Sequence, residues 1–207
     1  MIRNAATLIV LLTALGSQVG CRSLGLGGGG RGEFVSDEQP TKLAPRFTTR
    51  LFDSSDSNTA DMVLSDLDPT TLADRGGWGD TVGRVLQVRM FIRPYAGRTP
   101  IEPTACSVTM RYLVLAGGEY GIYAGGGFML ADGKPDGKEF GGRILNASMR
   151  LVSSSPGFKD LIGSGRMSLS FDVKRDTESV KRAVRNADFL AFGAQPAPDN
   201  PLLATGE

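Results

Sequence analysis

The stretch MSLSFDV, residues 167–173, alternates apolar and polar side chains without a break. Successive side chains of a β-strand point to opposite faces, so the four apolar residues of this stretch share one face. Such alternation predicts a strand with one buried and one solvated face. The same period of two recurs in residues 86–93, 107–114 and 145–151. Together these four segments predict a mostly β chain.

Shorter stretches between them extend the pattern. Residues 46–52, 61–65, 119–123 and 127–131 are further strand candidates. Turns rich in Gly, Pro and Asp separate the candidates at residues 95–98, 116–118, 132–137 and 155–157. We interpret Gly125–Gly127 as a hairpin turn or bulge. Seven or eight strands joined by such turns predict an antiparallel β-sandwich.

One amphipathic helix is expected near the C-terminal end. Asp176 or Thr177 can cap it, and the apolar residues from Val180 to Leu190 recur at helical spacing. A second, short helix is expected to begin at Asp68-Pro69, because Pro suits the first position of a helix.

The composition excludes several classes of chemistry. The 207 residues contain no His, so triads or dyads with His, His-ligated zinc and His acid–base catalysis are excluded. A formal charge of +1 argues against a nucleic-acid binder that depends on bulk charge.

The N-terminus has the pattern of a secretory signal peptide. Arg3 precedes an apolar run, residues 5–15, which is shorter than the roughly 20 residues that span a bilayer. The sequence Val19-Gly20-Cys21 follows.

In these residues the chain resembles the bacterial lipoprotein class, although Gln18 stands where Leu is usual. The resemblance implies that Cys21 is acylated and becomes the first residue of the mature chain, which anchors it in a membrane. Arg22 in place of Asp after that cysteine implies the outer membrane, with the domain facing the periplasm of a bacterial cell envelope. The alternative is an ordinary secreted protein cleaved near Ala14-Leu15-Gly16.

These signals divide the chain into four parts. Residues 1–20 form the signal peptide, and residues 21–33 the lipidated cysteine with a Gly-rich tether. Residues 34–193 form the β-sandwich domain, with 34–46 irregular, and residues 194–207 a disordered tail.

Two surface features are candidate binding sites. Five basic residues could contact anionic lipid or polysaccharide, although a solvated helix face explains them as well: Lys174, Arg175, Lys181, Arg182 and Arg185. Trp78, the single Trp, could stack on a sugar ring or plug one end of the domain, and we favour the plug.

The acidic residues are candidates for metal ligands and for catalytic groups. Asp53, Asp56, Asp61, Asp66 and Asp68 crowd one region, but their spacing matches no calcium loop, so no metal or cofactor is expected. Without His, a hydrolase would need a carboxylate pair drawn from Glu102, Glu119, Asp132, Asp136 and Glu139. Cys106 is expected to be a small buried hydrophobe.

We therefore expect a membrane-anchored envelope lipoprotein that is a structural or protein-binding module and not an enzyme. An envelope protein is the expected partner, and an exposed edge strand is a natural docking site for it. A glycan- or lipid-binding domain is the alternative, and a His-free hydrolase with paired carboxylates is a third hypothesis.

Overall fold

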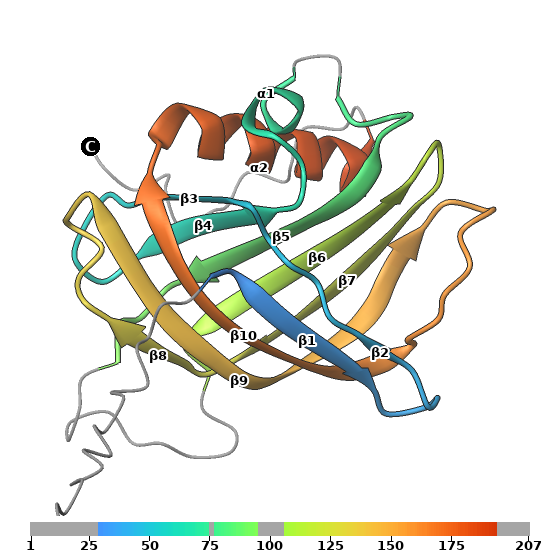
Figure 1. The fold of residues 1–207 in the computed structure, drawn as a ribbon, viewed down its shortest axis with the longest axis horizontal. Helices are drawn as coiled ribbons and strands as arrows, with labels where there is room; N and C mark the ends of the chain where they lie inside the picture. Colours follow the sequence, from blue (N-terminus) through green and yellow to red (C-terminus); the bar gives the residue numbers. More distant parts are fainter. Residues whose placement is uncertain (1–28, 75–76, 95–105, 194–207) are drawn as a thin grey trace, which may run out of the picture.

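The computed structural model describes residues 29–74, 77–94 and 106–193. Ten strands of this part form one sheet, and two helices accompany it (Figure 1). The elements are β1 (Arg31–Ser36), β2 (Lys42–Leu43), β3 (Thr49–Asp53), β4 (Ala60–Ser65), α1 (Pro69–Leu72), β5 (Val82–Met90), β6 (Val108–Ala116), β7 (Tyr120–Gly127), β8 (Met129–Asp132), β9 (Glu139–Ser154), β10 (Ser164–Arg175) and α2 (Thr177–Phe192).

The sheet closes on itself. Its order is β2-β1-β10-β3-β4-β5-β6-β7-β9-β8, and β9 also pairs with β10. The pairing of β9 with β10 runs from Ser164↔Arg150 to Lys174↔Glu139 and completes a ring of seven strands. The other edge of β10 pairs with β1 and, in parallel at Leu51 and Phe52, with β3.

Side chains fill the inside of the ring. Inward residues from neighbouring strands, such as Met62, Leu86 and Tyr112, belong to one buried cluster. Phe34 of β1 is in the same cluster and is 0% exposed. Burial of this apolar surface is the main source of stability that the packing provides.

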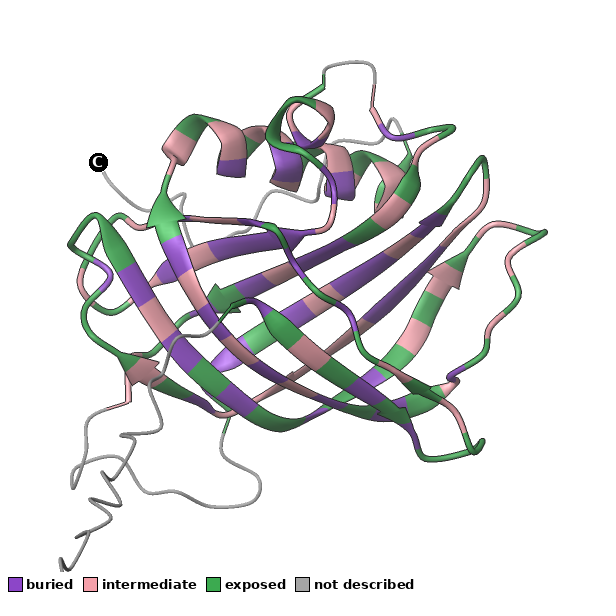
Figure 2. Ribbon diagram, viewed as in Figure 1, coloured by how far each residue is buried: buried purple, intermediate pink, exposed green. Residues whose placement is uncertain are grey.

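A second buried cluster lies outside the ring, under α2. Val63, Val85 and Leu113 alternate with the inward residues of their strands and pack in a cluster with Val180 and Ala183 of α2. Figure 2 shows the buried residues of α2 on its side toward the sheet. The parts of β4, β5 and β6 that lie under α2 are therefore buried on both faces. Further along, Arg89 of β5 and Thr109 of β6 are exposed on the outward face, as the alternation predicts.

A bulge interrupts the alternation of β9. Leu145 and Asn146 both lie opposite Ser168, between the pairs Met167↔Ala147 and Leu169↔Ile144. Asn146 has a φ of 53°, a conformation that Asn adopts more readily than most residues. The extra residue turns Leu145 outward, where it is 58% exposed, so our expectation that it shares a face with Ala147 is wrong.

The predicted mostly β domain with a C-terminal amphipathic helix is confirmed. A division of the strands into two facing sheets is not confirmed, because they belong to one closed sheet that also contains a parallel pair. Asp176 caps α2 by accepting a hydrogen bond from the Ser179 N–H, and Asp68 caps α1. Across the described residues, neither helix has the length and hydropathy needed to cross a membrane.

Two boundaries differ from the sequence prediction. The tether was expected to reach Glu33, but β1 begins at Arg31, and residues 34–46 contain the rest of β1 and β2. Gly125–Gly127 are not a turn; they end β7. A Cβ at Gly125 would overlap the carbonyl oxygen of Ser148, so the close approach of β9 requires Gly there.

Candidate interaction surfaces

Aromatic rings occupy the centre of the closed sheet. The Phe34 ring packs edge-on against Tyr123 and Tyr112, with centroids 5.3 and 5.9 Å away. Tyr112 is 0% exposed and Tyr123 is 2% exposed. These rings fill the space between β1, β6 and β7, and the depressions described below lie on the outside of the ring.

Tyr123 is tied to the loop that joins β9 and β10. Its hydroxyl donates a hydrogen bond to Asp160 Oδ1 at 2.5 Å, and the N–H groups of Ile162 and Gly163 donate to the same oxygen at 2.9 Å. Burial raises the pKa of the Tyr123 phenol, and the bond to Asp160 raises it further. Burial alone would raise the pKa of Asp160, but the bonds from Gly163, Tyr123 and Ile162 outweigh it, so that pKa is lowered.

We expect the free energy of unfolding of Asp160→Asn to fall less than that of the parent as the pH is lowered. A carboxyl whose pKa is lower in the folded state stabilises the fold above its unfolded pKa of about 4. That contribution is lost as the pH falls through the lowered, folded-state pKa. Denaturant unfolding at a series of pH values should therefore show the parent and the variant converging in acid.

Asp132→Asn is the matched control for this pH series, because Asp132 is an exposed carboxylate at the end of β8. The difference between the two variants separates the hydrogen bonds to Asp160 from the mere loss of one carboxylate. A profile for Asp160→Asn that parallels the parent's at every pH would show that the bonds to Asp160 do not stabilise the fold.

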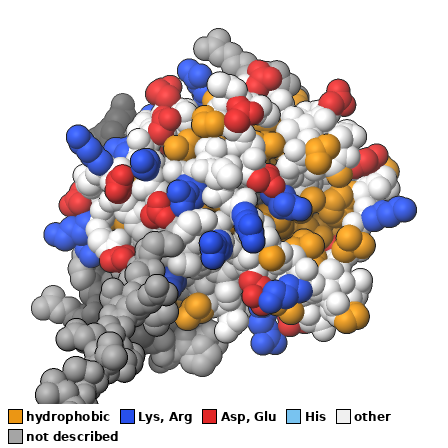
Figure 3. Space-filling model, viewed as in Figure 1, with side chains coloured by type: hydrophobic (Ala, Val, Ile, Leu, Met, Phe, Trp, Pro, Cys, Tyr) orange, Lys and Arg blue, Asp and Glu red, His pale blue; other side chains and the backbone are white. Residues whose placement is uncertain are grey.

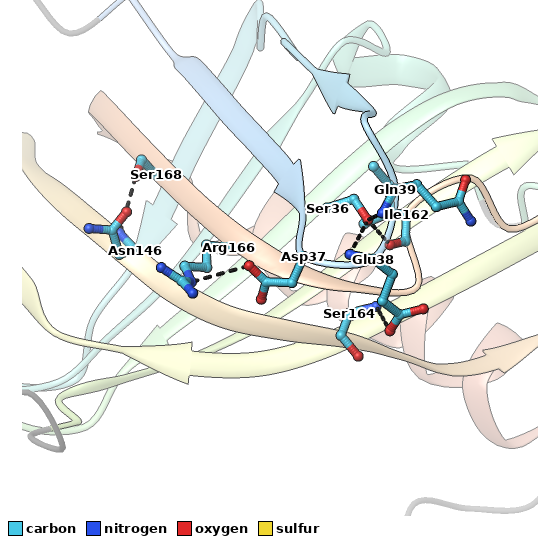
Figure 4. A network of polar contacts seen from close by, with 9 residues as sticks. All are labelled: Ser36, Asp37, Glu38, Gln39, Asn146, Ile162, Ser164, Arg166 and Ser168. Carbon is cyan, nitrogen blue, oxygen red and sulfur yellow. Dashed lines mark hydrogen bonds and ion pairs between the residues drawn. The ribbon is translucent and has the colours of Figure 1, made fainter.

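A polar network fastens the end of β1 to β10 (Figure 4). The buried Ser36 hydroxyl donates to the Ile162 carbonyl at 2.5 Å and accepts from the Glu38 and Gln39 N–H groups. Glu38 Oε1 accepts from the Ser164 N–H at 2.9 Å. Sequence reasoning missed this network, since Ser36 and Ile162 are far apart in the chain.

No helix of the described residues covers the outer side of β1, β9 and β10. Figure 1 shows α1 and α2 at the opposite side of the ring, above β3, β4 and β5. We call this uncovered side the open sheet face; its outward residues include Val35, Arg143, Leu145, Ser148, Arg150, Val152, Arg166 and Ser168. Lys and Arg are interspersed with Asp and Glu on the molecular face that Figure 3 shows.

The open sheet face combines arginines with isolated apolar side chains. Leu145 is 58% exposed and Val152 is 52% exposed, and Ser148 and Arg150 lie between them on β9. Between the strands, Arg166 pairs with Asp37 at 3.3 Å. A depression of about 400 Å³ adjoins this face and is lined by Asp37, Ser148, Arg150 and Ser164, among others.

The free ends of the sheet are short. The strands at the two ends of the sheet are β2, with two residues, and β8, with four. The long strands β9 and β10 pair with each other, so the edges by which they pair are not free. Short edges are a common protection against pairing with another chain. The expected docking at an edge strand therefore has less support than docking at the open sheet face.

The five basic candidates do not form one surface. The Arg175 guanidinium donates to the carbonyls of Pro135, Gly137 and Ser54 and lies 5.1 Å from the centroid of the Phe52 ring. It holds the turn between β8 and β9 and is a structural residue. Lys174 lies at the end of β10, 3.8 Å from Glu139. The remaining three, Lys181, Arg182 and Arg185, lie on α2.

Trp78 is buried outside the ring, beneath α2, and not at an open end of the domain. It is 1% exposed and belongs to the cluster beneath α2, with Leu67 and Leu72. Its indole N–H donates to the Thr71 carbonyl at 3.2 Å. With the ring enclosed in this way, no face of the indole is available to stack on a sugar.

The acidic candidates have separate structural roles. Asp56 Oδ1 accepts from the N–H groups of Asn58 and Thr59, and the bond from Asn58 is the main cause that lowers its pKa. Asp66 pairs with Arg84, and Asp53 accepts from the Thr177 hydroxyl. Burial raises the pKa of Asp61, although Arg89 opposes the shift. Among the described residues, no group of three or more acids or cysteines could hold a metal ion.

Two of the carboxylates considered for a hydrolase lie in one place. Asp132 and Glu139 line a depression of about 370 Å³ on the outside of the sheet, together with Asp172. Glu139 and Asp172 are occupied by Lys174 and Arg50, at 3.8 and 2.9 Å. Glu119 lies elsewhere and binds Ser155 and the Gly157 N–H, while Glu102 is outside the described residues.

Of the two cysteines, only Cys106 lies within the described residues. Cys106 is exposed, so our expectation of a buried side chain is wrong. Its thiol donates to the Val108 carbonyl at 3.1 Å, just before β6 begins. Cys21 and the tail from residue 194 lie outside the described residues.

Comparisons of the chain with protein-family models, with curated proteins and with solved structures find no match.

Proposed function

We propose that this chain is an envelope lipoprotein, anchored through Cys21, whose β domain acts by contact with a protein partner. The observation that supports the proposal is the contrast between the two outer sides of the ring. One side is buried under α2, whereas the open sheet face has Leu145 and Val152 exposed beside arginines. Arginine and apolar side chains together are typical of protein interfaces.

The position of the domain in the chain supports the anchor. β1 begins at Arg31, ten residues after Cys21, so the domain begins soon after the cysteine that would carry the lipid. The outer membrane, with the domain facing the periplasm, follows from Arg22 in the resemblance to lipoproteins.

The anchor can be tested on protein isolated from the cells that make it. The expected mature chain begins at acylated Cys21, so Cys106 is its one free thiol and reacts in the folded state because it is exposed. Intact mass and thiol titration measure both. A mature chain that begins between residues 15 and 17, with two free thiols, supports the ordinary secreted alternative instead.

The contact role can be tested with a photoreactive amino acid in place of Leu145 or Val152. Irradiation of intact cells should crosslink the same single protein from both positions. The matched control places the photoreactive residue at Val82, an exposed apolar position at the start of β5 that lies outside the open sheet face. Equal capture from all three positions, or no capture from either position on β9, would overturn the proposed role of the open sheet face.

A further inference from the structure

We propose that the outward side of α2 binds the surface of a bilayer that carries anionic phospholipids. This inference rests on the proposed lipid anchor, which places the domain at a membrane. It adds a second, weaker contact that orients the domain on that membrane.

The exposed residues of α2 form one stripe along the helix. Glu178, Lys181, Arg185, Phe189 and Phe192 are three or four positions apart, so they lie on one side of the helix. Val180, Ala183 and Ala187 are buried against the sheet on the other side. The stripe is therefore acidic at its first turn, basic in the middle and aromatic at its C-terminal end.

The basic part of the stripe is available to an anion. Lys181 and Arg185 of the stripe, and the half-buried Arg182 beside it, form no ion pair with any residue that the structure describes. Arg182 and Arg185 line a hollow of about 530 Å³ beside Ala73, Asp74 and Asn186. The acids nearby are Glu178, Asp74 and Asp188, and Asp188 is occupied by Arg111 at 2.6 Å.

The aromatic side chains of the stripe are large and apolar, yet about half of each is exposed to solvent. Phe189 is 60% exposed and Phe192 is 47% exposed, although the Arg111 guanidinium lies 5.8 Å from the Phe192 centroid. Basic residues beside exposed Phe are typical of helices that lie in the membrane interface. The cations then meet lipid phosphates, while the rings enter the boundary of the acyl chains.

The length of chain between the anchor and the domain favours a membrane over a distant partner. Seven residues lie between Cys21 and Gly29, so the Cα atoms of these two residues can be at most about 28 Å apart in a fully extended chain. A domain of this size has a diameter of about 40 Å. Some face of the domain must therefore remain near the bilayer, and of the outer surfaces described above the α2 stripe has the matching charge and exposed aromatic rings.

The test uses the chain from Arg22 to Glu207, which keeps every described element and cannot be acylated at Cys21. Flotation with vesicles of phosphatidylcholine and phosphatidylglycerol measures binding, and vesicles of phosphatidylcholine alone are the reference. We expect binding to the anionic vesicles that weakens with added salt. Arg182→Gln with Arg185→Gln should lower this binding tenfold or more, because both cations near an anionic surface contribute to it. Phe189→Ser with Phe192→Ser should also lower it.

The control variant carries Arg143→Gln with Arg150→Gln, which removes the same charge from the open sheet face. It should bind as the parent does, and unfolding of all variants should confirm that they fold. Equal loss in the control variant, or no binding by the parent, overturns the proposal. A dimer of the parent that Phe189→Ser with Phe192→Ser abolishes, without vesicle binding, assigns the stripe to a second copy instead. A mature chain without acylated Cys21 would remove the anchor, but it would leave this vesicle result unchanged.

Discussion

Phe34→Ala is expected to lower the free energy of unfolding by about 3–5 kcal/mol, the usual cost of truncating a buried Phe. Phe34 is 0% exposed and packs edge-on against both Tyr112 and Tyr123. Truncation therefore leaves a cavity between three strands of the closed sheet and removes two aromatic contacts. Denaturant unfolding of the variant and its parent, at constant slope, measures the difference.

Val35→Ala is the control for this change. Val35 is the next residue of β1, but it points outward and is 38% exposed, so its truncation should cost less than about 1 kcal/mol. Similar small losses for both variants would show that β1 does not contribute to the core. The result bears directly on the segment that the sequence assigned to tether and irregular chain.

The sequence missed β1 for a physical reason. Alternation is visible only when the inward positions are apolar, as they are throughout residues 167–173 of β10. In β1, the positions that flank inward Phe34 are Gly32 and Ser36. A Cβ at Gly32 would lie 3.1 Å from Pro45, and Ser36 uses its hydroxyl to bind the Ile162 carbonyl. Only small residues fit at these two crowded inward positions. Because Gly and Ser are not apolar side chains, the alternation of apolar and polar residues is not visible in the sequence of β1.

The closure of the sheet could not be predicted, because it depends on pairs between strands that the sequence pattern does not connect. The ring depends on the pairing of β9 with β10 and on two parallel pairs between β3 and β10, which join residues more than 120 positions apart. Alternation shows which residues face inward, but it does not show which strands are neighbours. One signal was available: Met62-Val63-Leu64 is a continuous apolar run, which is typical of a strand buried on both faces.

The candidate binding residues were predictable only in part. Proximity in sequence grouped Lys174 and Arg175 with the basic residues of α2. The fold separates them because the chain leaves β10 at Arg175, whose guanidinium turns to three backbone carbonyls. Helical spacing did place Lys181 and Arg185 together on the outward side of α2. The exposure of Phe189 and Phe192 could not be predicted, since apolar residues at helical spacing usually indicate the buried side.

Trp78→Ala is the second change with a large expected effect, a loss of about 3–5 kcal/mol in the free energy of unfolding. The indole is 1% exposed and fills the space beneath α2 and beside α1, and its N–H bonds the Thr71 carbonyl. Its removal leaves a cavity between the helices and the sheet. The control is Phe189→Ala, which truncates an exposed ring of α2 and should lower the free energy of unfolding by less than about 1 kcal/mol.

Because Trp78 is the single Trp, its fluorescence tests the same point without a substitution. Iodide should quench the folded chain far less than the unfolded chain, since the ring is enclosed. Equal quenching in both states would show an open indole and return Trp78 to the candidates for sugar binding. Weak quenching together with a large loss in Trp78→Ala would instead establish that this residue joins α1 and α2 to the sheet, and that any ligand of the domain is bound elsewhere.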